Sequence, residues 1–252
     1  TATESSETIT PGKLTIGTGL PAYPPYVIDD TPENGEGFEA AVAYAVAAEL
    51  GFAPEDVEWV RTDFNATIQP GPKNFDFNLQ QFSITEKRAE VIDFSDPYFV
   101  STQTVITVAG SKAEKATSLA DLKDLQIGAA TATTSFNAIE DLIKPSNPAQ
   151  AFNTNDEAVQ QLSTNQIDAI VVDLPTALFL TCCGLPEGSP EGKIIGQLEG
   201  AEAGGSWGLV LEKGSSLTAK VNAALKTLRD NGTLAELEKK WLPETTTIPF
   251  LK

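Results

Sequence analysis

An arginine and several hydroxyl side chains lie close together between Gln80 and Arg88. Thr85 stands where a helix N-cap is typical, which places Arg88 in the first helical turn, beside whatever Ser83 faces. A guanidinium in this position pairs with an anion, and the anion is either a neighbouring carboxylate in a surface salt bridge or a charged group of a ligand. The polar pair Gln80 and Gln81, directly before this stretch, favours the ligand.

A second hydroxyl group precedes a predicted helix in the middle of the chain. Thr131, Thr133 and Thr134 lie between a strand expected over 126–129 and a helix expected over 135–142. Hydroxyls and the unpaired N–H groups of a helix start together make a natural anion site. N-capping of the helix is the alternative interpretation, and the two roles are compatible.

A carboxylate ends the apolar strand predicted over 169–172. Asp173 directly follows this strand, and Pro175 is well placed to begin a helix. Asp173 would therefore either cap that helix or hold a cationic group of a ligand.

Two aromatic residues follow strands that we expect in the first part of the chain. Tyr23 lies on a proline-rich loop after the strand 14–18, and Phe64 follows the strand 57–61. In open α/β sheets the carboxyl ends of the strands form the ligand side, so both rings are candidates to wall a pocket. We assign Tyr26 to the core and Glu39 to the first turn of a helix that begins at 37–38.

The composition excludes several classes of function. The chain of 252 residues has 17 Lys and Arg against 35 Asp and Glu, a net charge of −18, and no His. Such a surface repels nucleic acid and anionic lipid. The absence of His removes the usual zinc ligand and the usual general base. Pro24 and Pro25 exclude the third glycine and the helix of a dinucleotide site after Gly17 and Gly19. We expect neither a metal nor a cofactor.

Residues 1–12 have the composition of a flexible leader, because they are polar and rich in Ser and Thr. The longest apolar run, 40–48, is far shorter than the roughly twenty residues of a membrane helix. Cys182 and Cys183 are adjacent, and we favour two small thiols over a vicinal disulfide.

The motifs SITEKR (83–88) and DFSDPY (93–98) resemble the signature of the amino-acid-binding extracytoplasmic solute-binding proteins that serve ABC transporters. The resemblance extends from about Lys13 to Trp241. It implies an α/β, two-lobed fold of the type II periplasmic-binding-protein class, with two βα lobes joined by a two-segment hinge. Lobe 1 would comprise 13–101 and 203–252, and lobe 2 would comprise 102–202. The βα alternation in the second lobe predicts a parallel sheet.

The resemblance also implies roles for individual residues. Arg88 would bind the α-carboxylate of an amino acid with help from Ser83, while the Gln81 carbonyl and Asp173 would bind the ammonium. The complete expected ligand-binding set is Tyr23, Phe64, Gln80, Gln81, Ser83, Arg88, Thr131, Thr133, Thr134 and Asp173. The implied partner is the membrane permease of an ABC transporter. The implied location is extracytoplasmic, in the periplasm or as a monomeric cell-surface lipoprotein tethered by its leader.

The chain departs from the family at two positions close to these expected binding residues. Ala132 replaces a glycine of the anion loop, and Leu20 stands where relatives that bind cationic amino acids, and some that bind glutamine, have an acid. Without that acid, we expect a neutral ligand side chain to be preferred over Arg and Lys by about tenfold.

Two other functions remain open on the same fold. One is a dehydratase of prephenate or arogenate, with Glu39 or Asp173 as general acid, and the other is the ligand-sensing domain of a receptor. The absence of His and the match of Arg88 and Asp173 to amino-acid capture favour a binding protein without enzymatic activity.

Overall fold

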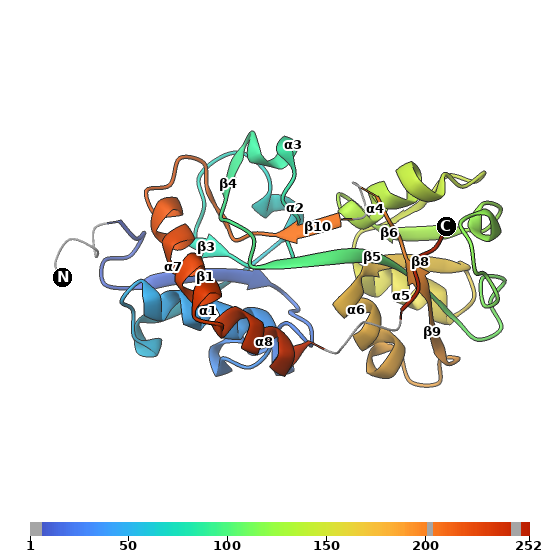
Figure 1. The fold of residues 1–252 in the computed structure, drawn as a ribbon, viewed down its shortest axis with the longest axis horizontal. Coiled ribbons are helices and arrows are strands. Elements are labelled where there is room, and N and C mark those ends of the chain that lie inside the picture. The colour runs from blue at the N-terminus through green and yellow to red at the C-terminus, as the bar shows by residue number, and fades with distance from the viewer. Residues whose placement is uncertain (1–6, 201–203, 243–247) are drawn as a thin grey trace. The chain divides into compact units, whose positions relative to one another are not determined.

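The computed structural model describes residues 7–200, 204–242 and 248–252, and they form two compact α/β units (Figure 1). Unit 1 contains residues 7–99 and 206–242. Unit 2 contains residues 100–200, 204–205 and 248–252. The chain leaves unit 1 after Phe99, returns at Ser206 and leaves again after Leu242. Each unit has its own sheet and its own apolar core.

The sheet of unit 1 has the strand order β2-β1-β3-β11-β4. Its strands are β1 (Leu14–Gly19), β2 (Val57–Thr62), β3 (Phe77–Asn78), β4 (Ile92–Phe94) and β11 (Val210–Glu212). β1, β2 and β3 are parallel, whereas β11 runs antiparallel to β3 and β4. The three parallel strands therefore end at one edge of the sheet, and the segments that follow them begin there.

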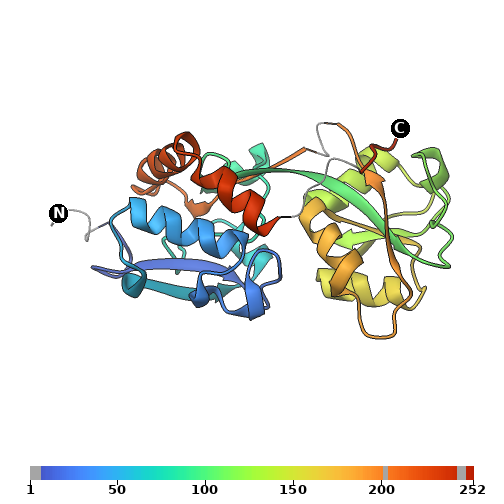
Figure 2. The same ribbon diagram turned by 60° about the horizontal axis from the view of Figure 1, so that its bottom comes forward.

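Three helices cover this sheet and contact one another (Figures 1 and 2): α1 (Phe38–Glu49), α7 (Thr218–Asp230) and α8 (Thr233–Trp241). The core between them is built from apolar residues such as Phe38, Val42 and Leu225, and it contains the buried Tyr26 and Trp207. Tyr26 packs edge-on against Trp207, with 5.6 Å between ring centroids, which confirms the assignment of Tyr26 to the core. The shorter helices of unit 1 are α2 (Phe64–Thr67), α3 (Glu86–Ala89) and the 3₁₀ turns η2 (Ile28–Asp30), η3 (Pro32–Asn34) and η4 (Pro54–Asp56).

The start of α1 depends on a close backbone approach. Tyr26 O accepts hydrogen bonds from the backbone N–H of Glu39 at 3.0 Å and of Ala40 at 3.2 Å, so the preceding loop caps the helix. Gly37 has φ 102°, and a Cβ at this residue would lie 2.4 Å from Tyr26 O. A side chain at position 37 would therefore push the capping loop away.

We predict that Gly37→Ala destabilises the protein by about 2–4 kcal/mol, because it combines a left-handed φ with a clash against backbone atoms. The matched control is Gly71→Ala, where φ is 116° but no atom lies within 4 Å of the added Cβ. Denaturant unfolding of both variants checks this. Equal losses would show that the close approach to Tyr26 contributes nothing.

The sheet of unit 2 follows the order β10-β5-β8-β6-β7, with β9 also paired to β5. Its strands are β5 (Phe99–Val108), β6 (Ile127–Ala130), β7 (Gln150–Phe152), β8 (Ala169–Asp173), β9 (Gly192–Gln197) and β10 (Gly204–Trp207). β6 is parallel to β8, as predicted, and also to β7, a strand that the sequence pattern did not indicate. β5 runs antiparallel to β8 and β9, so the prediction of a wholly parallel sheet was wrong. The βα alternation holds only for the three strands that helices connect.

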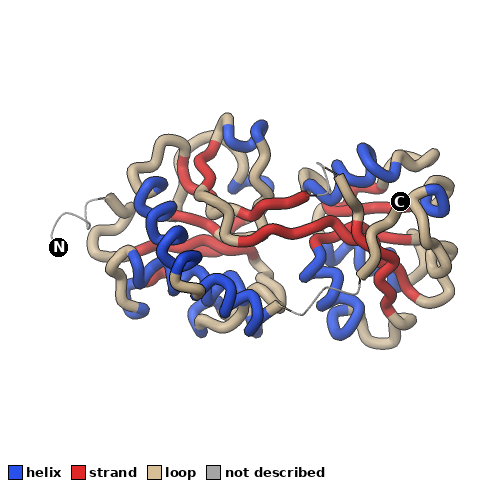
Figure 3. Tube along the Cα trace, viewed as in Figure 1, coloured by secondary structure: helices blue, strands red, loops and turns tan. Residues whose placement is uncertain are grey.

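In unit 2 an α-helix comes directly after each of the strands β6, β7 and β8 in the chain (Figure 3). α4 (Thr134–Ala138) continues as the π-helical turn η6 (Ile139–Ile143), and α6 (Leu174–Phe179) continues as the π-helical turn η7 (Leu180–Gly184). The other two are the 3₁₀ turn η5 (Ala120–Leu122) and α5 (Asn155–Ser163). Among the residues with described structure, no helix is long and apolar enough to cross a bilayer.

The two cysteines form a disulfide in η7. Cys182 and Cys183 are bonded to each other and both are exposed, so the expectation of two small thiols was wrong. Adjacent residues in this tight turn bring the two sulfur atoms together, which a sequence pattern does not reveal.

The chain ends differ from the expected division. Residues 248–252, which the resemblance assigned to lobe 1, join unit 2: Leu251 is part of its core, and the Leu251 N–H donates to Gln197 O at 2.8 Å. Of the expected leader, residues 1–6 lie outside the described residues. Its later part is attached to unit 1, because the Ile9 N–H donates to the Asp76 carboxylate at 2.9 Å.

Candidate functional site

Three of the predicted site segments meet at the carboxyl edge of the sheet in unit 1. Tyr23 follows β1, Phe64 follows β2, and the stretch from Gln80 to Arg88 follows β3. Because β1, β2 and β3 are parallel neighbours, these segments share one edge. The topology therefore brings together residues that lie more than sixty positions apart in the sequence, such as Tyr23 and Arg88.

Arg88 is positioned by the helix start that the sequence predicts. Thr85 is the N-cap of α3, and its hydroxyl accepts from the Arg88 N–H at 3.1 Å. The Arg88 guanidinium donates to Ser83 O at 2.8 Å and lies 5.5 Å from the centroid of the Phe64 ring. The Phe64 ring in turn stacks on Phe82, with 4.7 Å between centroids. The cation is thus oriented by a carbonyl and an aromatic face, two contacts that suit a guanidinium.

Glu39 lies in the first turn of α1, as predicted, and it is buried there. Its side chain is only 2% exposed, and its carboxylate accepts from the Gln81 N–H at 2.9 Å, from the Gln81 amide and from the Tyr98 hydroxyl. Gln81 has φ 48°, a left-handed conformation that costs a residue with a side chain about 1–2 kcal/mol. The buried carboxylate therefore holds the loop that leads to Ser83 and Arg88.

Burial raises the pKa of the Glu39 carboxyl, although the hydrogen bonds from Tyr98 and Gln81 oppose this shift. The folded protein consequently keeps this proton to a higher pH than the unfolded chain does. The contribution of Glu39 to stability is present in full below its ordinary pKa of 4.5 and is lost as the pH rises through the raised value.

We predict that Glu39→Gln removes this pH dependence. The free energy of unfolding of the variant, relative to the parent, should rise as the pH increases from about 4.5. Urea unfolding between pH 4 and pH 8 measures the difference, with the exposed Glu58→Gln as the matched control. A difference that stays constant or falls over this range would contradict a buried, perturbed carboxyl at position 39.

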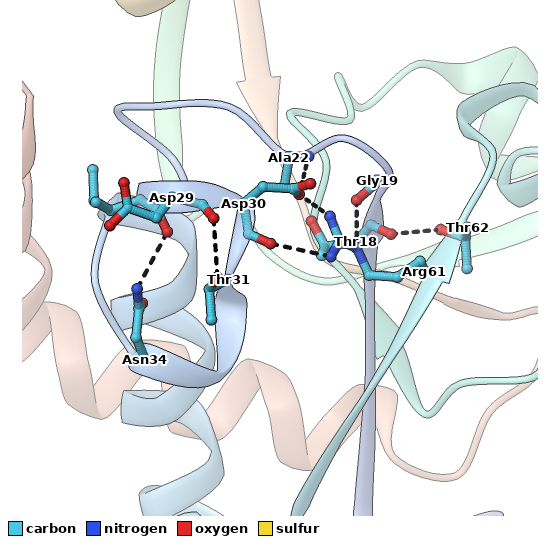
Figure 4. Close-up of polar contacts among 10 residues, drawn as sticks. Thr18, Gly19, Ala22, Asp29, Asp30, Thr31, Asn34, Arg61 and Thr62 are labelled. Atoms are coloured by element: carbon cyan, nitrogen blue, oxygen red, sulfur yellow. Dashed lines mark hydrogen bonds and ion pairs between the residues drawn. The ribbon is translucent and has the colours of Figure 1, made fainter.

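An ion pair fixes the loop that carries Tyr23 (Figure 4). The Arg61 guanidinium at the end of β2 pairs with the Asp30 carboxylate and donates to Gly19 O at 2.8 Å. Partial burial acts to raise the pKa of Asp30, but hydrogen bonds from the Ala22 N–H and from Arg61 outweigh it and hold the pKa below its usual value. No local pattern indicates this pair, because its partners are far apart in the chain.

In unit 2 the three threonines lie at a helix start, as predicted. Thr133 is the N-cap of α4, and its hydroxyl accepts from the Phe136 N–H at 3.1 Å. Ala132 has φ 61°, so it occupies a conformation that favours glycine, the residue that the resemblance implies here. The Thr131 N–H donates to Phe152 O at 2.7 Å. The N-capping alternative is therefore present at Thr133.

Gln103 joins the two predicted polar groups of unit 2, and the sequence analysis missed it. This residue lies in β5 and is fully buried. Its amide donates to Asp173 Oδ1 at 2.9 Å and to Thr134 Oγ1 at 3.1 Å, and its carbonyl accepts from the Ser135 hydroxyl. Asp173 is the N-cap residue of α6, but its side chain makes no capping hydrogen bond to the helix backbone. Its carboxylate is instead oriented by Gln103.

Each unit thus carries polar side chains at the ends of parallel strands, held in place by buried neighbours. Unit 1 presents a guanidinium over the Phe64 ring, and unit 2 presents a carboxylate bonded to the same amide as the Thr134 hydroxyl. Among the described residues, no three metal-ligating side chains gather as a metal site would require. The folds of the two units define a two-lobed α/β binding protein of the type II periplasmic class.

Comparison with known proteins identifies the family. The family model of bacterial extracellular solute-binding proteins, family 3, matches residues 14–244, and the chain belongs to this family. It is 29% identical over 237 residues to the arginine-binding extracellular protein ArtP of Bacillus subtilis, a match that covers 91% of this chain and 86% of ArtP.

Solved structures agree with this assignment. Structures of an ancestral arginine-binding protein, bound to arginine in one case and to glutamine in another, superpose with a TM-score of 0.75 at 32% identity. Both matches cover 92% of this chain and 99% of that protein. The protein is therefore a solute-binding protein of this family, and these relatives are amino-acid-binding proteins and not enzymes.

Proposed function

We propose that this protein captures a free amino acid with polar side chains of both units and delivers it to the membrane subunits of an ABC importer. In this proposal Arg88 binds the α-carboxylate and Asp173 binds the α-ammonium. The observation that carries the proposal is that unit 1 holds an oriented guanidinium and unit 2 holds an oriented carboxylate. A zwitterion has complementary charges for both.

The remaining predicted site residues supply shape and further polar contacts. Tyr23 and Phe64 would pack against the ligand side chain, Gln80, Gln81 and Ser83 would line the same edge of unit 1, and Thr131, Thr133 and Thr134 would face the ligand from unit 2. A ligand that contacts both units favours their closed arrangement by its differential affinity. Membrane subunits could then distinguish the loaded protein from the empty one.

The proposed location and partner follow from the family. Relatives are named as extracellular or periplasmic binding proteins, and one is named as the glutamine-binding protein of an ABC transporter. We infer that this protein also works outside the cytoplasm, as a periplasmic protein or a lipid-anchored one.

The ligand is the finer question. Relatives named for arginine binding favour a basic amino acid. Leu20, which is 68% exposed, stands where an acid would anchor a cationic side chain, and Asp30 nearby in the sequence is already paired with Arg61. These residues favour a neutral side chain, and a direct competition between glutamine and arginine separates the two possibilities.

We predict that Arg88→Lys lowers amino-acid affinity by about a hundredfold or more, because a buried carboxylate that loses its two-pronged partner costs roughly 3–5 kcal/mol. Arg229→Lys, on the surface of α7, is the matched control. Calorimetric titration of both variants measures the effect. Binding by Arg88→Lys within about threefold of the parent would refute the role of Arg88.

We predict that Asp173→Asn weakens binding and reduces ligand-induced compaction, because the ammonium loses its charged partner in unit 2. Small-angle scattering with saturating ligand should then show a radius close to that of the ligand-free protein. The exposed Asp141→Asn should compact as the parent does. If Asp173→Asn also compacts fully, this carboxylate does not bind the ligand.

A further inference from the structure

Two glycines of β1 make room for two amide side chains from the neighbouring strand. A Cβ at Gly17 would lie 2.3 Å from Asn78 Nδ2, and a Cβ at Gly19 would lie 2.5 Å from Gln80 Nε2. Asn78 and Gln80 are two residues apart, so their side chains project from the same face of an extended chain. Both amides therefore lie across β1, where it reaches the carboxyl edge of the sheet.

The oxygen atoms of these two amides lack partners. Asn78 Oδ1 and Gln80 Oε1 are both buried, and neither accepts a hydrogen bond from any residue that the structure describes. The Asn78 amide is oriented by Thr62. Its Nδ2 donates to Thr62 Oγ1 at 2.8 Å and the Thr62 hydroxyl donates to Thr18 O at 3.3 Å, so Oδ1 points away from Thr62.

A buried acceptor without a partner is unfavourable, and most such atoms in folded proteins are satisfied. Two of them on adjacent side chains, at the edge where the proposed ligand binds, need an N–H or O–H donor from outside the protein. Asn78 is fully buried, whereas Gln80 is only half-buried and lies closer to solvent. Gln80 is therefore the residue that a ligand reaches first.

The charged residues near these two amides do not select the charge of the ligand's side chain. Arg61 donates to the carbonyl of Gly19, beside the Gln80 amide, but its charge is paired with Asp30. The two amide oxygens are themselves neutral. They discriminate between donors and acceptors and not between charged and uncharged groups.

Resting on the proposed function, we propose that Gln80 and Asn78 form an acceptor pair that receives the N–H groups of the ligand's side chain. The ligand is then an amino acid whose side chain ends in a planar N–H donor, an amide or a guanidinium. Apolar side chains would leave both oxygens unsatisfied, and carboxylate side chains would bring further acceptors against them. Gln80 becomes the residue that determines specificity.

The test compares ligands of similar size in calorimetric titrations. L-glutamine and L-arginine are the donor ligands, and L-methionine, L-leucine and L-glutamate are the comparisons. Gln80→Leu removes the acceptor with little change in volume, and the exposed Gln69→Leu is the matched control. Thermal unfolding of each variant shows that it is folded.

We expect the parent and Gln69→Leu to bind glutamine or arginine at least tenfold more tightly than methionine, leucine and glutamate. Gln80→Leu should reduce this preference by about tenfold while methionine binding changes little. Methionine or leucine as tight as the best donor ligand in the parent, or equal losses for all ligands in Gln80→Leu, would overturn the inference. The first comparison needs no variant.

Failure of the proposed function would look different, because then no amino acid would bind the parent. The glutamine and arginine titrations also separate the two donor classes. A preference for arginine would refute only the expectation, drawn from Leu20, of a neutral side chain.

Discussion

The architecture of the unit 1 site depends on the hydrogen bonds that the buried Glu39 carboxylate accepts. A carboxylate removed from water needs hydrogen bonds, and it obtains them from the Gln81 backbone, the Gln81 amide and the Tyr98 hydroxyl. These bonds connect the first turn of α1 to the loop after β3 and to the residue just before β5. The left-handed Gln81 then directs the chain toward Ser83 and Arg88. The first-turn acid of α1 is therefore a structural anchor for this loop.

Unit 2 uses the same principle with a neutral group. Gln103 has no charge, but its single amide orients Asp173, Thr134 and Ser135 at once. In both units a buried polar residue with at least three hydrogen bonds holds a more exposed functional group in one orientation. Binding energy is then not spent on ordering those groups, which is the benefit of preorganisation.

Much of the fold could be predicted from the sequence, because apolar spacing and glycine positions mark α1, α5, α7 and the parallel strands. The N-caps Thr85 and Thr133 were also predictable, since their signal is local. The antiparallel pairing of β5 and the return of residues 248–252 to unit 2 were not, because partners distant in the chain determine them. The same limit applies to the site. Arg88 and Asp173 lie within recognisable motifs, whereas Glu39, Gln103 and the Arg61–Asp30 pair act through contacts across 30 to 70 residues.

The central claim is that the protein recognises both charges of a free amino acid. The most direct measurement is a calorimetric comparison of the best-binding amino acid with two derivatives, its α-carboxyl amide and its N-acetyl form, which remove one charge each and keep the side chain. The account predicts that both derivatives lose at least about a hundredfold in affinity, or roughly 2.7 kcal/mol. Binding of either derivative within a few-fold of the free amino acid would contradict it.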